Sequence, residues 1–332
     1  MSGPGPKTIA VTGATGFVGR HMCRALIAGG RRVRALVRDR DKSRDALGGL
    51  GPDQGLTAVI GDVFNPSAVK RLLTGCDAVV HTIGIRRELP PEVTFARHHP
   101  GATRAVLDGA RSAGVRRFVH ISALGTRADA PSAYHRSKFE SEGLVRASGL
   151  EWTILRPSLI HGPDGEFVRM VKGWVLGRSA PWFFIPYFAR VEVSRSFPPR
   201  PPRLESALVQ PVHVDDVAAA GVRALEMPEA VGEVYPLTGP ESLDWPEVIG
   251  AIRDAMHLTD RRKRLLPMPG PVGFAVASVA GALGLGALLD FGPSEPLMAT
   301  EDQMARTDKA GAHLGFRPRR FHDSLRAYAP SI

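Results

Sequence analysis

Short apolar runs alternate with amphipathic stretches through the first half of the chain. Helical spacing of apolar residues runs from Phe17 to about Ala28 and again over 92–113, where Pro100 is expected to split or kink the helix. The apolar runs predict six buried strands, at 8–11, 33–37, 56–60, 78–83, 116–122 and 152–157. Strands that alternate with helices predict an α/β fold with a doubly wound parallel sheet and a ligand at the carboxyl ends of its strands.

Beyond residue 160 the pattern is less regular. The segment 173–203 is rich in aromatic residues, proline and arginine, so it either walls a lipophilic pocket, rests on a membrane interface or packs as a long loop. The apolar stretch 272–289 is read as a core helix, with membrane-surface contact and a true span as alternatives. From Glu233 a short strand, and then a helix beginning near Asp244, predict a small C-terminal α+β region.

The stretch TGATGFVG, from Thr12 to Gly19, joins the first strand to the first helix. Gly13 permits a sharp turn, Gly16 leaves room for a pyrophosphate against the backbone, and Gly19 permits close helix packing. Free N–H groups and the dipole at the helix start favour phosphate. A tight turn without a ligand is the alternative, but this context predicts a dinucleotide cradle, whose contacts are Gly13, Thr15, Gly16, Phe17, Val18 and Gly19.

A second motif, SAYHRSK, carries Tyr134 and Lys138. On a helix the i, i+4 spacing puts both side chains on one face, where the ammonium is expected to favour the ionised phenol. Such a phenol can exchange a proton with a substrate oxygen while a hydride moves.

These motifs resemble those of the short-chain dehydrogenase/reductase superfamily, with its TGxxGxxG and YxxxK signatures. LRP at 155–157, GP at 162–163 and QPVHVDDVA at 210–218 add a likeness to extended and atypical members. The branch that the chain most resembles contains the nucleotide-binding accessory subunit of respiratory complex I and its bacterial relatives. The resemblance implies a Rossmann sheet, a bound NAD(P) and a smaller C-terminal substrate region.

The resemblance also implies a hydroxyl that holds the substrate oxygen at the end of the fifth strand. Ser122 is the candidate catalytic residue, but alignment with extended epimerases puts Ala123 at the serine position. The alternative is that Ser122 caps the strand end and that Thr126 substitutes for it.

Further cofactor contacts follow the other strands. Arg38, at the end of the second strand, can pair with the 2′-phosphate of NADP(H), which is therefore favoured; Asp39 leaves NAD(H) as the alternative. The remaining contacts, which the resemblance implies, are Asp62, Val63, Thr82, Ile83, Gly84, Lys138 and Pro157. His81, at the end of the fourth strand, is interpreted as structural, and so are Asp215 and Asp216, because Asp suits a helix start.

The composition of the chain limits the classes of partner that it is expected to bind. Lys plus Arg 43 against Asp plus Glu 33 gives a net charge of +10, yet no nucleic-acid-binding signature accompanies it. A phosphate-bearing cofactor or an anionic membrane explains this excess, and no nucleic acid or metal is expected. Cys23 and Cys76 have neither metal nor redox spacing. The opening MSGPGPK has no apolar signal region, so a cytoplasmic protein is expected, with membrane association as an alternative.

Two functions follow. The first is an NADP(H)-dependent oxidoreductase or epimerase acting on a carbonyl or hydroxyl of a lipophilic small molecule. The alternative is a non-catalytic NADPH-binding subunit or redox sensor on a membrane assembly like complex I. The expected organisation is a nucleotide-binding core at 1–162, a substrate-facing insertion at 163–209, a return to the core at 210–230 and a substrate or docking domain at 231–332.

Overall fold

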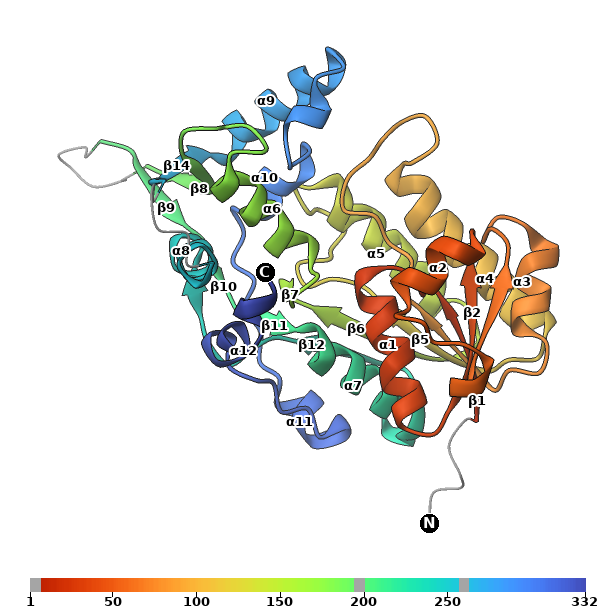
Figure 1. Ribbon diagram of the computed structural model, residues 1–332. Coiled ribbons are helices and arrows are strands. Elements are labelled where there is room, and N and C mark those ends of the chain that lie inside the picture. Colours follow the sequence, from red (N-terminus) through yellow and green to blue (C-terminus); the bar gives the residue numbers. More distant parts are fainter. Residues whose placement is uncertain (1–6, 194–200, 257–262) are drawn as a thin grey trace.

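The computed structural model describes residues 7–193, 201–256 and 263–332 (Figure 1). Two parts of the sequence expectations lie outside the described residues. They are the leader at 1–6 and the end of the aromatic segment, 194–200.

Seven of the described strands form one sheet in the order β12-β6-β5-β4-β1-β2-β3, and every neighbouring pair is parallel. This confirms the predicted α/β fold with a Rossmann doubly wound sheet. Each of the six predicted runs becomes a strand, with small shifts at the ends, and β12 is the seventh strand of the sheet. The seven strands are β1 (Thr8–Thr12), β2 (Arg32–Val37), β3 (Leu56–Ile60), β4 (Ala78–His81), β5 (Arg117–Ile121), β6 (Glu151–Pro157) and β12 (Glu233–Leu237).

Helices cover both faces of this sheet. α1 (Phe17–Ala28) and α7 (Val214–Glu226) pack together on one face over Ile9 and Val11, and α11 (Asp308–Leu314) adds to the same core. Alternate strand residues such as Ala10 point to the other face. That face is covered by α3 (Pro66–Leu73), α4 (Ala102–Ser112) and α5 (Ala133–Arg146).

Two boundaries differ from the sequence expectation. Leu89 bridges to Val93, so the helix expected from residue 92 starts later, and Pro100 lies inside the π-helical turn η2 (Arg97–Gly101) that leads into α4. A proline has no N–H to donate, and a π turn accommodates that loss. The strand expected at Glu233 in the C-terminal domain is β12 and pairs with β6, which extends the return to the core past residue 230.

Most of the remaining elements form a second body beside the carboxyl ends of the sheet (Figure 1). Its core joins the aromatic side chains Trp174, Phe188, Trp245, Phe291 and Phe321. Short pairings link it to the chain on either side, through β7 (Ile160–His161) with β11 (Val212–His213) and β10 (Leu208–Val209) with β13 (Leu243–Asp244). Its other main elements are α6 (Glu166–Leu176), β8 (Ile185–Glu192), β9 (Arg203–Ser206), α8 (Trp245–Ala255), β14 (Leu265–Pro269), α9 (Gly270–Ala282), η4 (Gly286–Leu288), α10 (Ser294–Met298) and α12 (Phe321–Tyr328).

The apolar stretch 272–289 is broken into α9 and η4. Gly284 stands between them with φ 71°, a left-handed conformation that ends the helix. In the described parts of the chain, no helix combines the length and apolarity that crossing a bilayer requires.

Candidate active site

The glycine-rich turn between β1 and α1 has no room for side chains. Gly13 has φ 75°, and a Cβ there would lie 2.7 Å from Thr82 Oγ1 and 2.9 Å from Ile83 N. A Cβ on Gly19 would overlap the Gly13 carbonyl oxygen, so this glycine closes the helix onto the turn itself. The sequence predicted that Gly19 lets the helix pack close to the sheet, whereas its close neighbour in the structure is the glycine-rich turn itself.

The start of α1 is suited to a phosphate. Gly16 caps the helix without a side chain, and the first turn contains no acidic residue. Backbone N–H groups at such a helix start, together with the helix dipole, bind anions. Gly16, Phe17 and Val18 line a cavity, and Thr15 is exposed beside them, so the turn fits the pyrophosphate of a dinucleotide.

One cavity of about 340 Å³ runs from this turn into the second body. Tyr134 and Lys138 lie along it, and so do Thr82, Gly84 and Pro157 from the ends of the central strands. Its far part is lined mainly by apolar side chains, among them Phe167, Met170, Trp174, Phe188 and Phe291. The segment from 173 onward thus contributes to the pocket wall, whereas its Trp182 and Phe183 are exposed.

Lys138 is buried on α5 at the carboxyl end of β5. Its Nζ donates to the Ile121 carbonyl oxygen over 3.1 Å. Burial lowers the pKa of Lys138 to about 8, and nearby Glu142 partly opposes the shift. His81 shares this buried layer: its ring meets Thr12 Oγ1 at 2.7 Å and Thr103 Oγ1 at 3.2 Å, which agrees with the structural role expected for it.

The Tyr134 phenol is favoured in its neutral form. Burial, with Glu166 and Glu295 adding to it and Arg86 opposing, raises the pKa of Tyr134 to about 12. The sequence expectation that Lys138 promotes the phenolate therefore differs from the structure. The Lys138 ammonium donates to a carbonyl of β5 instead, and the two carboxylates that help to raise the pKa of the phenol, Glu166 and Glu295, belong to the second body. At neutral pH the Tyr134 phenol therefore holds its proton.

Sequence reasoning missed the charged cluster beside this phenol. Arg86 Nε lies 3.1 Å from Glu166 Oε2, and an Arg86 amino group also donates to Glu295. All three residues line the cavity, and burial raises the pKa of Glu295 against the opposing effect of Arg86. Arg86 follows Gly84 closely enough to have been suspected, but nothing in the sequence places Glu295 beside it.

Ser122 lies at the cavity, but its hydroxyl is already engaged. Ser122 Oγ donates to Glu142 Oε1 over 2.6 Å. Glu142 is fully buried and also accepts from Arg156 at 2.8 and 2.6 Å and from Arg146 at 2.7 Å. The neighbouring Ala123 has no hydroxyl, so the catalytic role of Ser122 stays a prediction.

The other predicted cofactor residues lie around the ends of β2, β3 and β4. Arg38 is exposed, whereas Asp39 caps α2 (Arg40–Ala46) by accepting from Asp41 N and Lys42 N. Asp62 accepts from Phe64 N over 2.8 Å and so shapes the turn after β3. Val63 is buried, Ile83 is partly buried, and Thr82 Oγ1 donates to the Thr12 carbonyl oxygen. None of these contacts tests a nucleotide role.

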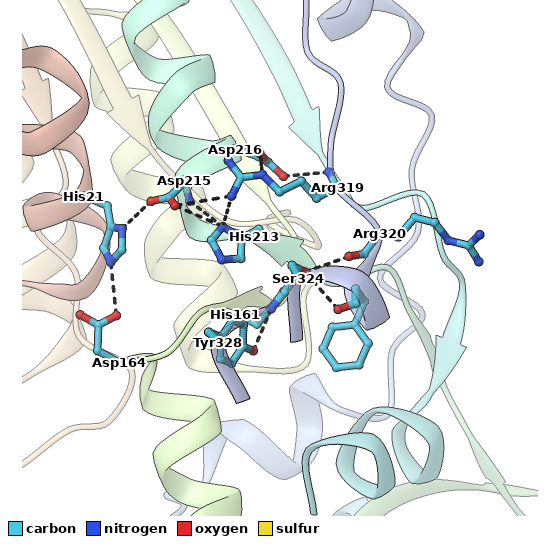
Figure 2. Close-up of polar contacts among 11 residues, drawn as sticks. His21, His161, Asp164, His213, Asp215, Asp216, Arg319, Arg320, Ser324 and Tyr328 are labelled. Atoms are coloured by element: carbon cyan, nitrogen blue, oxygen red, sulfur yellow. Dashed lines mark hydrogen bonds and ion pairs between the residues drawn. The ribbon is translucent and has the colours of Figure 1, made fainter. Parts of the chain in front are cut away.

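A network of histidines and carboxylates joins α1 to the second body (Figure 2). His21 lies between Asp215 at 2.6 Å and Asp164 at 3.2 Å, and its hydrogen bond is the largest effect that lowers the pKa of Asp215 to about 2. Arg319 pairs with Asp216 at 3.1 Å. Asp215 and Asp216 therefore have contacts that fit a structural role, although the cap of α7 is His213. The network fixes the loop before α6 against α1.

No three or more His, Cys, Asp or Glu side chains of the described residues gather in a way that could hold a metal ion.

Comparisons with known proteins agree with this geometry. A family model described as NAD(P)H-binding matches residues 13–176. A ceramide reductase from Caulobacter vibrioides is 31% identical over 283 residues, which are 85% of this chain and 77% of that protein. The mitochondrial NADH dehydrogenase (ubiquinone) 1 alpha subcomplex subunit 9 of Dictyostelium discoideum is 28% identical over 244 residues; the match covers 74% of this chain but only 62% of the subunit.

Solved structures share the architecture. An NADPH-dependent quinone oxidoreductase from Escherichia coli, complexed with NADPH, has a TM-score of 0.69 at 18% identity, and the match covers 96% of this chain and 99% of that one. At this identity the likeness shows the fold alone.

Proposed function

The chain belongs to the extended and atypical short-chain dehydrogenases/reductases, which bind NAD(P), and from that premise we propose that it is an NADPH-dependent reductase of lipophilic carbonyl compounds. One observation carries the proposal: a single cavity connects the phosphate-binding turn, the Tyr134–Lys138 pair and an apolar chamber. A carbonyl at the end of an apolar body would meet the phenol while the body fills the chamber.

Each residue of the site has a separate role in the proposed reduction. NADPH supplies a hydride when it is bound, and the chain's own groups prepare the acceptor. Tyr134 donates its proton to the carbonyl oxygen, and its raised pKa keeps that proton in place until reduction. Lys138 binds the ribose. Arg86, held between Glu166 and Glu295, orients a polar group of the substrate next to the phenol.

The preference for NADPH rests on the end of β2. Arg38 is exposed and extends from the strand end, where a 2′-phosphate would lie. Asp39, which would serve the ribose hydroxyls of NADH, already accepts two backbone hydrogen bonds at the start of α2. A carboxylate occupied in this way is a poorer ribose ligand.

The test is a fluorescence titration with NADPH and NADH, followed by measurement of NADPH oxidation with membrane lipid or quinone extract and with long-chain ketones. We expect oxidation that falls about 10²-fold or more in Tyr134→Phe, while NADPH affinity is retained. Tyr187→Phe is the matched control, because Tyr187 is another phenol of the same cavity, outside the Tyr134–Lys138 pair. Unchanged turnover in Tyr134→Phe would remove the proposed acid.

A second candidate has its own observation. The Ser122 hydroxyl is committed to Glu142 and Ala123 follows it, so no serine of β5 is free to hold a substrate oxygen. The absence of a free hydroxyl at this position favours a non-catalytic NADPH-binding subunit that docks on a membrane assembly. Tight NADPH binding without oxidation of any tested carbonyl or quinone would support this alternative over the reductase.

A further inference from the structure

The outward face of α9 is apolar where a surface helix is normally polar. Val272, Val276, Val279 and Leu283 follow one another at i, i+4, i+7 and i+11 and are 48%, 42%, 58% and 67% exposed. The opposite face is buried: a Cβ on Gly273 would press against the Phe188 ring of β8. The helix therefore has one apolar face on the body and a second facing outward.

Side-chain polarity is nearly absent from this helix. Ser278 is the single polar side chain of α9, and its hydroxyl donates to the Phe274 carbonyl oxygen over 2.8 Å. The four stripe residues themselves carry no side-chain donor or acceptor for a partner, and the one hydroxyl of the helix has already used its donor.

A loop with two exposed aromatic residues adjoins the end of this helix. Ala180 N donates to the Leu288 carbonyl oxygen at 3.0 Å, and Ile185 N donates to that of Arg264 at 2.9 Å. Trp182 and Phe183 lie between these anchors and are 49% and 88% exposed. The same loop therefore borders both η4 and the strand that leads into α9. Figure 1 shows α9 at the outer edge of the second body, away from the central sheet.

Basic residues flank this surface, and the acidic neighbour, Asp290, is engaged by the Ser179 hydroxyl. Arg178 precedes the loop, and Lys263 and Arg264 precede β14. Among the described residues these three side chains have no carboxylate within ion-pairing distance, and the stretches 167–191 and 263–289 contain no Asp or Glu. An apolar surface with a basic border complements an anionic membrane.

We propose that this surface, the apolar platform of Trp182, Phe183, Val272, Val276, Val279 and Leu283, docks onto an anionic lipid bilayer. A protein partner would be expected to use about one hydrogen bond per 100–200 Å², and the apolar stripe of α9 offers none; Trp182 would suit either kind of partner. A bilayer needs no hydrogen bonds, and tryptophan suits the headgroup boundary.

The platform lies directly behind the cavity wall. Phe188 contacts α9 from inside and lines the cavity, so a lipophilic molecule leaving the bilayer has only a short distance to cover. Docking itself does not depend on the proposed reductase, because vesicle binding requires neither cofactor nor turnover.

The test is co-sedimentation of the full chain with phosphatidylcholine vesicles, with and without phosphatidylglycerol. We expect binding to the anionic vesicles, weakened by salt, and a loss of roughly tenfold or more in the Val279→Glu, Leu283→Glu double variant. Val231→Glu is the matched control, since Val231 is 40% exposed just before β12, on the central sheet. It should bind vesicles as the wild type does, and NADPH binding checks that each variant is folded.

Quenching by brominated lipid gives a second readout. Trp182 should be quenched in anionic vesicles, and Trp182→Phe should remove that component. Absence of vesicle binding, or binding that the double variant leaves unchanged, would overturn the proposal. A different result would also overturn it: the wild type does not bind vesicles but forms a concentration-dependent dimer, and the double variant is monomeric. The platform would then join two copies of the chain.

Discussion

Replacing Ser122 by alanine separates a structural hydroxyl from a catalytic one. Ser122 Oγ lies 2.6 Å from the carboxylate of Glu142, which has no exposure to solvent. Removing this hydrogen bond leaves the carboxylate with its two arginine partners but one donor short. Hydrogen bonds to charged groups contribute about 1.5–3 kcal/mol, so we expect a loss of about 2 kcal/mol in the free energy of unfolding.

Thermal unfolding and steady-state kinetics, both on the same preparations, measure the two effects. A loss of this size lowers Tm by about 3 °C, because the entropy of unfolding of a 332-residue chain is about 0.7 kcal/mol/K. Turnover at saturating substrate should change by less than about threefold, because the Ser122 hydroxyl already donates its hydrogen bond to Glu142. Ser141→Ala is the control: its buried hydroxyl donates to the Ser137 carbonyl oxygen within the same helix, and its loss should cost less than about 1 kcal/mol.

The opposite pattern would refute this reasoning. If Ser122→Ala unfolded at the wild-type temperature but lost about 10²-fold in turnover, the hydroxyl would serve the substrate and its bond to Glu142 would contribute little.

Three further predictions concern the cofactor. Gly19→Ala should weaken NADPH binding at least about tenfold in a fluorescence titration, because the new methyl group overlaps the Gly13 carbonyl; Gly143→Ala, whose Cβ would meet nothing within 4 Å, should bind normally. Arg38→Ala should weaken NADPH roughly tenfold or more and leave NADH unchanged, and an equal loss for both would argue against a 2′-phosphate contact. With the pKa of Lys138 lowered to about 8, its ammonium is present below that pH and lost above it, so NADPH affinity should fall from pH 7 to 9. In the unfolded chain Lys138 keeps its proton up to about pH 10.5, so Lys138 makes the cofactor-free protein more stable, not less, as pH rises above 8. An NADPH affinity that does not change with pH would contradict a contact between Lys138 and the cofactor.

The central sheet could be predicted because its signals are local. A strand such as Leu56–Ile60 is a bounded apolar run, and the turn after β1 needs glycine for reasons of backbone geometry alone. Tyr134 and Lys138 share a helix, so their spacing was enough to bring them to one cavity.

The charged groups of the site could not be predicted in the same way. Arg86 and Glu295 form an ion pair although they lie far apart in the sequence. Only the packing of the two bodies brings them close to the Tyr134 phenol. Ser122 was read from its place at the end of a strand, whereas its contact is decided by which way the hydroxyl points. The pKa of Tyr134 depends on its burial and on the nearby carboxylates, neither of which the sequence shows. The i, i+4 spacing to Lys138 therefore predicted a lowered pKa, whereas the pKa is raised.

The place of α11 in the fold has a consequence for biosynthesis. Ala310 and Leu314 complete the core around α1 and α7, although about 70 residues of the second body separate them from β12. While the chain is emerging from the ribosome, that part of the sheet's cover is missing and apolar side chains of α7 remain exposed. Such a nascent chain is a natural client for a chaperone until residues beyond 308 have been translated.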